Sequence, residues 1–219
     1  PRPTQSSTLS IGDDNGTRRL WCVNPDANSV SVIHATTGAK EGEFAVGTNP
    51  RGIARDANGR YWVTCQGSDE IRVLNADGTL HVTIPLAYGS APFGIASSPD
   101  GSLLYVTLSG SGRLHRYSAA APNNAPLVTS GLITPRALAI SADGNRVLVT
   151  RFISPEMHAE VGEFTASLGF VRVFTLASAN TLDGGDRAAG VPNYLAGIAI
   201  SPDGTRAAIV SKQDNTQRG

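Results

Sequence analysis

Two arginines and one aromatic residue occupy the same place in successive copies of a repeat, and their side chains could together bind an anion. Arg51, Phe93 and Arg136 each follow a proline, and Ala196 takes the corresponding position in a further copy. A guanidinium group presents a planar fork of N–H donors that fits a carboxylate or a phosphate. These residues can act together only if the fold arranges the copies around one axis.

The repeat contains a Gly-Ile-Ala or similar segment, then a turn, and then a short run of aromatic or β-branched residues. The turns read RDANG, SSPDG, SADG and SPDG, and the runs that follow them read YWVT, LLYVT, RVLVT and RAAIV. An earlier copy of the run, LWCVN, covers Leu20 to Asn24. Asn-Gly and Asp-Gly turns favour a tight reversal between two antiparallel strands. Each copy therefore predicts at least one pair of strands.

The spacing of the copies predicts the fold class. The intervals are 41, 43, 43 and 60 residues, measured between Trp21, Trp62, Tyr105, Leu148 and Ala208. A period in the low forties with several strands per unit is typical of an all-β propeller of four-stranded antiparallel blades. In the second copy the expected strands cover residues 52–55, 60–66, 70–75 and 81–86. A repeat of helix pairs has a similar period, but the strand-like alternation and Gly-rich turns argue against it.

We expect one domain over residues 1–219 with about four and a half blades. The predicted blades lie near residues 7–48, 49–90, 91–132 and 133–193, with a partial blade at 194–219. A ring of about seven blades of ~42 residues would need roughly 290 residues. The sequence therefore predicts an incomplete ring, whose missing blades come from further sequence or from another chain. The absence of an initiating Met fits a chain that was processed or cut from something longer.

The segment NSVSVIHATTGAKEGEFAVGTNPRGIARDANGRYWVTC resembles the YVTN-type β-propeller repeat. The tetrapeptide that gives this repeat its name corresponds here to WCVN, WVTC, YVTL and LVTR, and the resemblance runs from about Leu20 to Lys212. It implies an extracytoplasmic, bacterial or archaeal protein that is periplasmic, secreted or on the cell surface. The ending SPDGTRAAIVSKQDN is also similar to propellers that continue into a c-type cytochrome or peroxidase-like region.

Blade topology predicts which loops share a face. The turns between the first and second strands lie on one face, while the loops after the second strand and the links between blades lie on the other. The second face would hold the predicted ligand-binding residues Arg51, Phe93, Arg136, Arg151 and Lys212. We expect a positive potential there and an anionic small molecule or an acidic protein patch as its partner. In the alternative interpretation, the arginines bind loop carbonyls at the blade edges, or Asp69, Glu70 and Asp214 neutralise them.

The 60-residue interval holds about 17 extra residues. The sequence places them chiefly in Phe152 to Phe170, as a movable flap over the mouth of the central channel. The flap contains Glu156, His158, Glu160 and Glu163, which include metal-ligating types, but one histidine in an acidic loop favours a solvated loop over a metal site.

Composition excludes several classes of partner and cofactor. The chain has 18 Lys and Arg residues and 18 Asp and Glu residues, so no net field favours nucleic acid or an anionic membrane. No apolar run approaches the ~20 residues that span a bilayer. Cys22 and Cys65 lack zinc and redox spacing, and their equal strand parity predicts that they are unpaired. No catalytic, haem-attachment, phosphate-binding or metal motif is visible, and the histidines outside the expected flap, His34, His81 and His115, suggest no triad, so no cofactor is expected.

Two functions follow from these observations. The first is a non-catalytic binding or scaffold module that presents a ligand-binding or protein-binding face outside the cytoplasm. The second is the propeller portion of an enzyme, either a lyase or hydrolase that uses channel residues, or a haem-containing oxidase or peroxidase whose catalytic region lies outside this chain. The lack of a catalytic signature favours the first.

Overall fold

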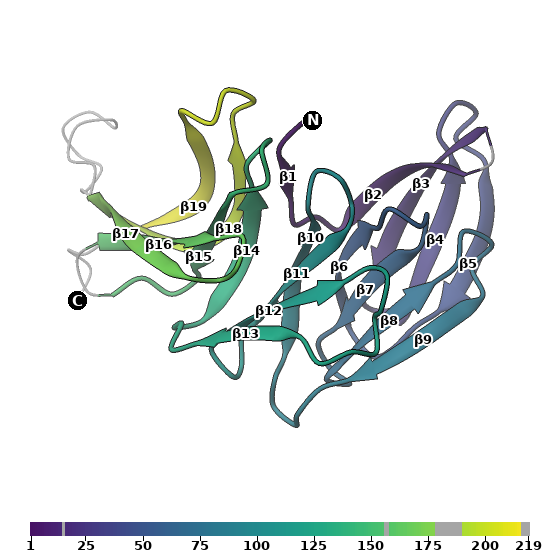
Figure 1. Ribbon diagram of the computed structural model, residues 1–219, viewed down its shortest axis with the longest axis horizontal. Coiled ribbons are helices and arrows are strands. Elements are labelled where there is room, and N and C mark those ends of the chain that lie inside the picture. Colours follow the sequence, from purple (N-terminus) through teal and green to yellow (C-terminus); the bar gives the residue numbers. More distant parts are fainter. Residues whose placement is uncertain (15, 156–157, 178–189, 216–219) are drawn as a thin grey trace.

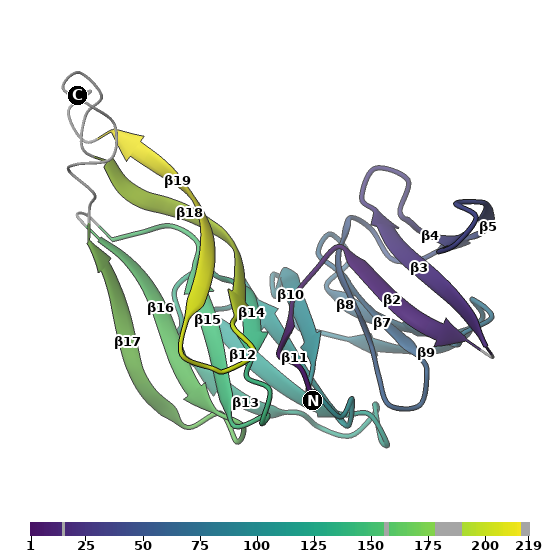
Figure 2. The same ribbon diagram turned by 90° about the horizontal axis from the view of Figure 1, so that it is seen from above.

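The chain folds into five antiparallel β-sheets that follow one another around an arc (Figures 1 and 2). The computed structural model describes residues 1–14, 16–155, 158–177 and 190–215. Within these residues there is no helix, and hence none that is long and apolar enough to cross a membrane. The all-β class predicted from the repeat is confirmed.

Three sheets have four consecutive strands in simple up-and-down order, the fourth has four such strands with β1 (Thr4–Gln5) added beside β14, and the fifth is a hairpin. The first contains β2 (Leu9–Asp14), β3 (Thr17–Asn24), β4 (Ser29–His34) and β5 (Lys40–Ala45). The second contains β6 (Pro50–Arg55), β7 (Tyr61–Cys65), β8 (Glu70–Leu74) and β9 (Leu80–Pro85). The third contains β10 (Pro92–Ser97), β11 (Leu103–Leu108), β12 (Arg113–Ser118) and β13 (Leu127–Ser130). The fourth contains β14 (Pro135–Ile140), β15 (Arg146–Arg151), β16 (His158–Thr165) and β17 (Phe170–Ala177). The fifth contains β18 (Gly190–Ile200) and β19 (Ala207–Asn215).

The observed strands of the second sheet match the four predicted ones to within two residues at each end. The last boundary needs correction, because β18 begins at Gly190 and not near residue 194. The first sheet and the final hairpin lie at opposite ends of the arc (Figures 1 and 2).

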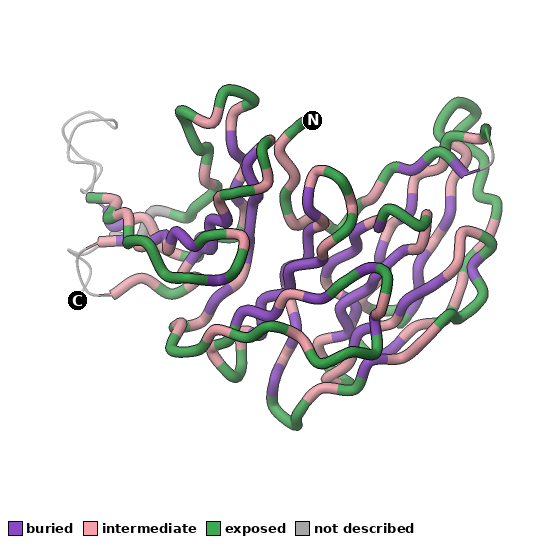
Figure 3. Tube along the Cα trace, in the orientation of Figure 1, coloured by how far each residue is buried: buried purple, intermediate pink, exposed green. Residues whose placement is uncertain are grey.

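The core lies between neighbouring sheets. Alternate residues of a strand point to opposite faces, so Tyr61 and Val63 of β7 pack against Trp21 of the first sheet, whereas Trp62 packs with Leu104 of the third. All five residues of β7 are buried. Figure 3 shows the buried residues gathered along the inner strands and the exposed ones along the turns. A sheet in the middle of the arc thus packs against one neighbouring sheet on each of its two faces.

Buried threonine hydroxyls join the innermost strands of neighbouring sheets. Thr107 on β11 accepts a hydrogen bond from the N–H of Gly94 in its own sheet (2.8 Å) and donates one to the carbonyl oxygen of Arg136 in the next sheet (2.6 Å). Thr64 on β7 does the same between Gly52 (3.0 Å) and the carbonyl oxygen of Phe93 (2.7 Å). This threonine is the third residue of the repeated tetrapeptide, so the motif is explained by a contact between blades.

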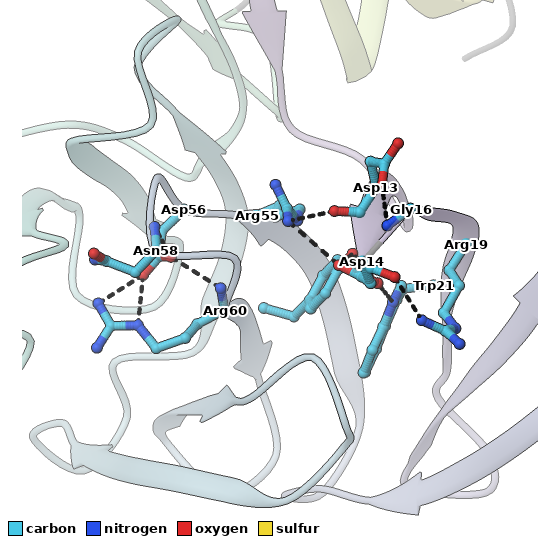
Figure 4. A network of polar contacts seen from close by, with 10 residues as sticks. Asp13, Asp14, Gly16, Arg19, Trp21, Arg55, Asp56, Asn58 and Arg60 are labelled. Atoms are coloured by element: carbon cyan, nitrogen blue, oxygen red, sulfur yellow. Dashed lines mark hydrogen bonds and ion pairs between the residues drawn. The ribbon is translucent and has the colours of Figure 1, made fainter.

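Tryptophan and aspartate residues fix the inner strands of the first two sheets. The buried Asp14 accepts a hydrogen bond from the indole N–H of Trp21 (3.3 Å) and pairs with Arg55 (3.3 Å), as Figure 4 shows. At the equivalent position of the second sheet, Asp56 accepts from the indole of Trp62 (2.9 Å) and forms an ion pair with Arg60. These buried carboxylates are therefore fully engaged within the scaffold.

The N-terminal segment crosses the centre of the arc. Strand β1 (Thr4–Gln5) pairs with the free edge of β14, and Figure 1 shows it between β14 and β10. The N–H of Ser6 donates to the carbonyl oxygen of Leu138 (2.8 Å), and the carbonyl oxygen of Ser7 accepts from the N–H of Ile53 (2.9 Å). This segment therefore connects the innermost strands of the second and fourth sheets, an arrangement that the repeat did not predict.

The predicted flap at residues 152–170 is wrong. Residues 158–165 form β16, which pairs along its length with β15 and β17, and residues 166–169 form the turn between β16 and β17. The extra length of the fourth repeat is instead distributed over the longer strands β16, β17 and β18 and over residues 178–189, which lie outside the described residues. Glu163 is buried between Arg146 and Arg172, where it forms ion pairs with both at 2.6 Å. Glu156 also lies outside the described residues.

The cysteines are free, as their strand parity predicted. Cys65 points into the apolar cluster between the first two sheets. Trp21 and Val23 point into that same cluster from β3, so the residue between them, Cys22, faces the other side. Burial raises the pKa of the Cys65 thiol to about 12, which keeps this group protonated and unreactive.

The close approach of neighbouring inner strands predicts different effects of alanine at two equivalent glycines. A Cβ atom at Gly94 would lie 2.2 Å from the carbonyl oxygen of Arg136, whereas one at Gly197 would meet Val210 at 3.7 Å, an ordinary contact. We expect Gly94→Ala to lower the free energy of unfolding by about 1–3 kcal/mol or more and Gly197→Ala to change it by less than about 0.5 kcal/mol. Urea unfolding followed by tryptophan fluorescence measures both. Equal losses in the two variants would contradict the proposed steric constraint.

Candidate functional site

The candidate site lies at the N-terminal ends of the innermost strands. Asn49, Ala91, Thr134 and Tyr194 all have a positive φ, between 42° and 53°, at equivalent places in the repeat. Close to each of these residues, the innermost strand shifts its register against the second strand of the same sheet. Such a shift is a β-bulge. A bulge redirects the side chain that it carries. This local geometry presents Arg51, Phe93 and Arg136 at one end of the inner strands, as their common repeat position predicted.

These side chains form part of a row of cations and aromatic rings, which we call the cation–aromatic ladder. The Arg51 guanidinium carbon lies 5.6 Å from the centroid of the Phe93 ring, and that of Arg136 lies 3.9 Å from it. Arg136 also lies 3.6 Å from the centroid of Phe152. The ladder continues through an edge-to-face contact between Phe152 and Tyr194 (5.2 Å) to Lys212, whose ammonium nitrogen is 5.5 Å from the Tyr194 centroid.

The central cation of the ladder has no ion-pair partner among the described residues. Both faces of the Arg136 guanidinium are in contact with phenyl rings, and its buried Nε has no hydrogen-bond partner among the described residues. Burial, and then the charge of Arg51, lower the pKa of Arg136. Arg51 donates from Nε to the amide oxygen of Gln66 (2.7 Å) and not to a carboxylate. Within the described part of the chain, neither arginine has an ion-pair partner.

Arg151 does not belong to this unpaired group. Arg151 is the last residue of β15, at the same end of the sheet, but it donates to the carbonyl oxygen of Ile153 (3.0 Å) and forms an ion pair with Glu160 (2.9 Å). His158 also contacts Glu160, at 3.1 Å. Burial alone would raise the pKa of Glu160, but the hydrogen bonds from Arg151 and His158 lower it. Arg151 is therefore a neutralised residue at the border of the site.

The expected neutralising acids are engaged elsewhere. The carboxylate of Asp69 accepts the backbone N–H groups of Gly89 (2.8 Å) and Ala91 (2.7 Å), so it stabilises the link between two sheets. Glu70 forms an ion pair with Arg72 at 2.9 Å. The side chain of Asp214 lies outside the described residues. The interpretation in which Asp69 and Glu70 neutralise the arginines is therefore wrong.

Other reactive residues are dispersed. His34 accepts hydrogen bonds from turn amides, His81 contacts Arg60, and the buried His115 contacts the hydroxyl of Tyr117, where burial lowers its pKa to about 4. Among the described residues, no three His, Cys, Asp or Glu side chains form a group that could hold a metal ion.

Comparisons with known proteins address the fold. No protein-family model matches the chain, and no curated protein sequence matches it. The chain is similar in structure to the hydrazine synthase of Kuenenia stuttgartiensis, with a TM-score of 0.79, 22% sequence identity, and coverage of 95% of this chain and 56% of that one. It is also similar to the virginiamycin B lyase from Staphylococcus aureus, with a TM-score of 0.63, 16% identity, and coverage of 90% of this chain and 60% of that one.

The fold is a β-propeller. The chain spans less than two thirds of each of the two similar proteins. At these identities the similarity extends to the fold and to nothing finer.

Sequence reasoning missed two members of the ladder. Phe152 directly follows the repeated strand run, and Tyr194 lies within β18, where the pairing with β19 shifts register. Phe152 follows Arg151, and Tyr194 stands two residues before Ala196, at the repeat position that carries Arg51 and Arg136 in other copies. An aromatic residue near such a position is the signal that could have identified them. Phe152 was instead attributed to the flap, because the length of the interval does not reveal where the extra residues are placed.

The environment of Arg136 predicts that its charge contributes little to stability. Arg136→Met keeps the side-chain length and the ring contacts and removes a partly buried cation that has no ion-pair partner among the described residues, so we expect the free energy of unfolding to change by less than about 1 kcal/mol. Arg60→Met is the matched comparison, because it leaves the buried carboxylate of Asp56 without its ion pair and should cost about 3–5 kcal/mol. Thermal and urea unfolding of both variants measure the difference. A large loss with Arg136→Met would identify Arg136 as a structural residue.

Proposed function

We propose that the chain is an extracytoplasmic β-propeller module of the YVTN type that binds an anionic ligand at the cation–aromatic ladder. The observation that carries this proposal is the sandwiched guanidinium of Arg136. It is a partly buried cation with no acidic partner among the described residues, and Arg51 stands on the same ring of Phe93. A desolvated cation without a counter-charge is costly, and an incoming anion offsets that cost.

The shape of the ladder supports a carboxylate or phosphate group as the ligand. Phe93 and Phe152 cover the two faces of the Arg136 guanidinium, so its remaining N–H donors point outward in the plane of the group. A guanidinium that presents its edge binds carboxylate or phosphate oxygens in a bidentate manner. The rings also offer apolar contact to the body of the ligand. An acidic patch on a protein partner would meet the same donors.

The position of the N-terminal segment favours a ligand site at the end of the inner strands, at the ladder, and not in the centre of the arc. Residues of this segment hydrogen-bond to β6 and β14 along the axis of the arc. The ligand therefore approaches from the side of the ladder, where Arg51, Arg136 and Lys212 gather.

The alternative function is the propeller portion of an enzyme. Both structurally similar proteins carry the names of enzymes, but that resemblance concerns the fold alone. A downstream sequence with a haem-attachment motif would favour this alternative, whereas the ladder itself requires no catalytic group.

Anion titrations test the binding proposal. We expect the full chain to bind benzoate or inorganic phosphate in isothermal titration calorimetry, with an affinity that falls as salt is added. Arg51→Ala and Arg136→Ala should each weaken binding by about tenfold or more, because charge-assisted hydrogen bonds contribute about 1.5–3 kcal/mol. The double variant should not bind measurably.

Arg113→Ala is the matched control. Arg113 is an exposed arginine at the start of β12, without an ion pair among the described residues and outside the ladder. Its replacement removes the same charge but should reduce affinity by less than about twofold. The proposal fails if the unaltered chain binds neither anion, or if Arg113→Ala weakens binding as much as Arg136→Ala does.

A further inference from the structure

No described strand pairs with the outer edges of β5, β9, β13 and β17, the outermost strands of the four complete sheets, and three of these strands carry features that hinder pairing with another chain. Strand β5 contains the charged residues Lys40, Glu41 and Glu43, β9 ends with Pro85, and β13 has only four residues. Charges, prolines and short length are the usual protections of an exposed strand edge. These three edges are therefore poor templates for association.

The fourth outer strand, β17, lacks these protections. It runs for eight residues, FVRVFTLA, with a single charged residue, Arg172, and no proline. Its exposed fractions are high for apolar side chains: 64% for Phe170, 49% for Val171 and 46% for Val173. An apolar groove of about 230 Å³ borders it and is lined in part by Ile133, Phe170 and Val173. A long, apolar, unprotected edge of this kind is a template for strand addition.

We propose that β17 is a dimerisation edge that pairs antiparallel with β17 of a second copy of this chain, with the twofold axis at Val173. A twofold axis perpendicular to the sheet places Val173 opposite its own counterpart. It then places Arg172 opposite Phe174 and Val171 opposite Thr175, each pair occurring twice. Residues directly opposite each other on antiparallel strands point to the same face and interact most strongly.

The residues of β17 are complementary to themselves in this register. No two like charges face each other, and each Arg172 meets an aromatic ring of the partner strand. Within one chain Arg172 already lies over the Phe174 ring, at 4.6 Å from the centroid, so the guanidinium is positioned for such a contact. A register centred one residue earlier would place the two Arg172 side chains opposite each other, and their repulsion disfavours it.

Strand β19 is the competing edge, because it ends the final hairpin and carries the exposed Val210. Its second half contains Lys212 and Asp214. Lys212 takes part in the cation–aromatic ladder through its contact with Tyr194. Strand β17 has one charged residue in eight, whereas β19 has two in nine. Among the described side chains, β17 also exposes three large apolar residues, Phe170, Val171 and Val173, against Val210 on β19. We therefore assign the self-association to β17.

Charged substitutions at Val173, the residue on the twofold axis, test the proposal. A variant that merely failed to fold would not regain the dimer when mixed with a variant of opposite charge. Sedimentation velocity of the full chain over a range of concentrations should show a monomer–dimer equilibrium. Val173→Lys alone and Val173→Glu alone should each raise the dissociation constant about tenfold or more, because each places two like charges opposite each other. An equimolar mixture of the two variants should restore the dimer, since Lys then faces Glu.

Two control variants locate the interface. Thr83→Lys introduces the same charge at the corresponding position of β9 and should leave the equilibrium unchanged. Val210→Lys does so on β19 and should also leave it unchanged. The proposal is overturned if the unaltered chain stays monomeric at all concentrations, if Val210→Lys and not Val173→Lys abolishes the dimer, or if the Lys and Glu variants fail to pair when mixed. Because the ladder lies outside β17, anion binding by Val173→Lys should match that of the unaltered chain.

Discussion

The hydrogen bond that a buried threonine hydroxyl makes between neighbouring sheets sets the geometry of this molecule. Thr64 and Thr107 each accept a backbone N–H from their own sheet and donate to a carbonyl oxygen of the next. The bond holds two inner strands so close that a Cβ atom at Gly52 or Gly94 would collide with the same carbonyl. The hydrogen bond from threonine therefore requires glycine at the facing position, because a larger residue would separate the two strands. The carbonyl groups that they hold belong to Phe93 and Arg136, so the contact that spaces the blades also positions the ladder.

The junction between the fourth and fifth sheets departs from this pattern, and its chemistry changes with it. Thr150 donates to the carbonyl oxygen of Leu195, one residue before the position that the earlier copies would use. Ala137, whose N–H donates to Thr150, stands there at the position that Gly52 and Gly94 take in the earlier sheets. The altered junction also presents Tyr194 to Phe152 and Lys212. A small change in backbone pairing has thus extended a row of two arginines and one ring into a longer ladder.

The sequence predicted most of the fold because each local signal agrees with the global one. Alternating apolar residues and Asp-Gly or Asn-Gly turns located the strands of the second sheet, and a regular period located the sheets. The position of the extra residues in the fourth repeat was not predictable, because strands of eight and of five residues satisfy the same alternation. The course of the N-terminal segment was also not predictable, since its serine and threonine residues bond through main-chain and hydroxyl groups that leave no periodic signature. Half of the ladder was predicted from the repeat position, whereas Phe152, just after β15, and Tyr194, within β18, lie outside that position and meet only in the folded chain.

The formal net charge of zero conceals how the charges are used. Asp14 and Asp56 are bound to indole and guanidinium groups, Glu163 lies between two arginines, Glu160 neutralises Arg151, and Asp69 accepts backbone amides. Each of these carboxylates contributes to the scaffold at the place where it lies. Arg51 and Arg136 have no such partner among the described residues, and they lie near the starts of β6 and β14, on either side of Phe93 in the chain. The local electrostatic potential therefore depends on which charged residues form ion pairs and hydrogen bonds within the fold. A chain with zero net charge can present a positive site where its carboxylates bind partners in other places.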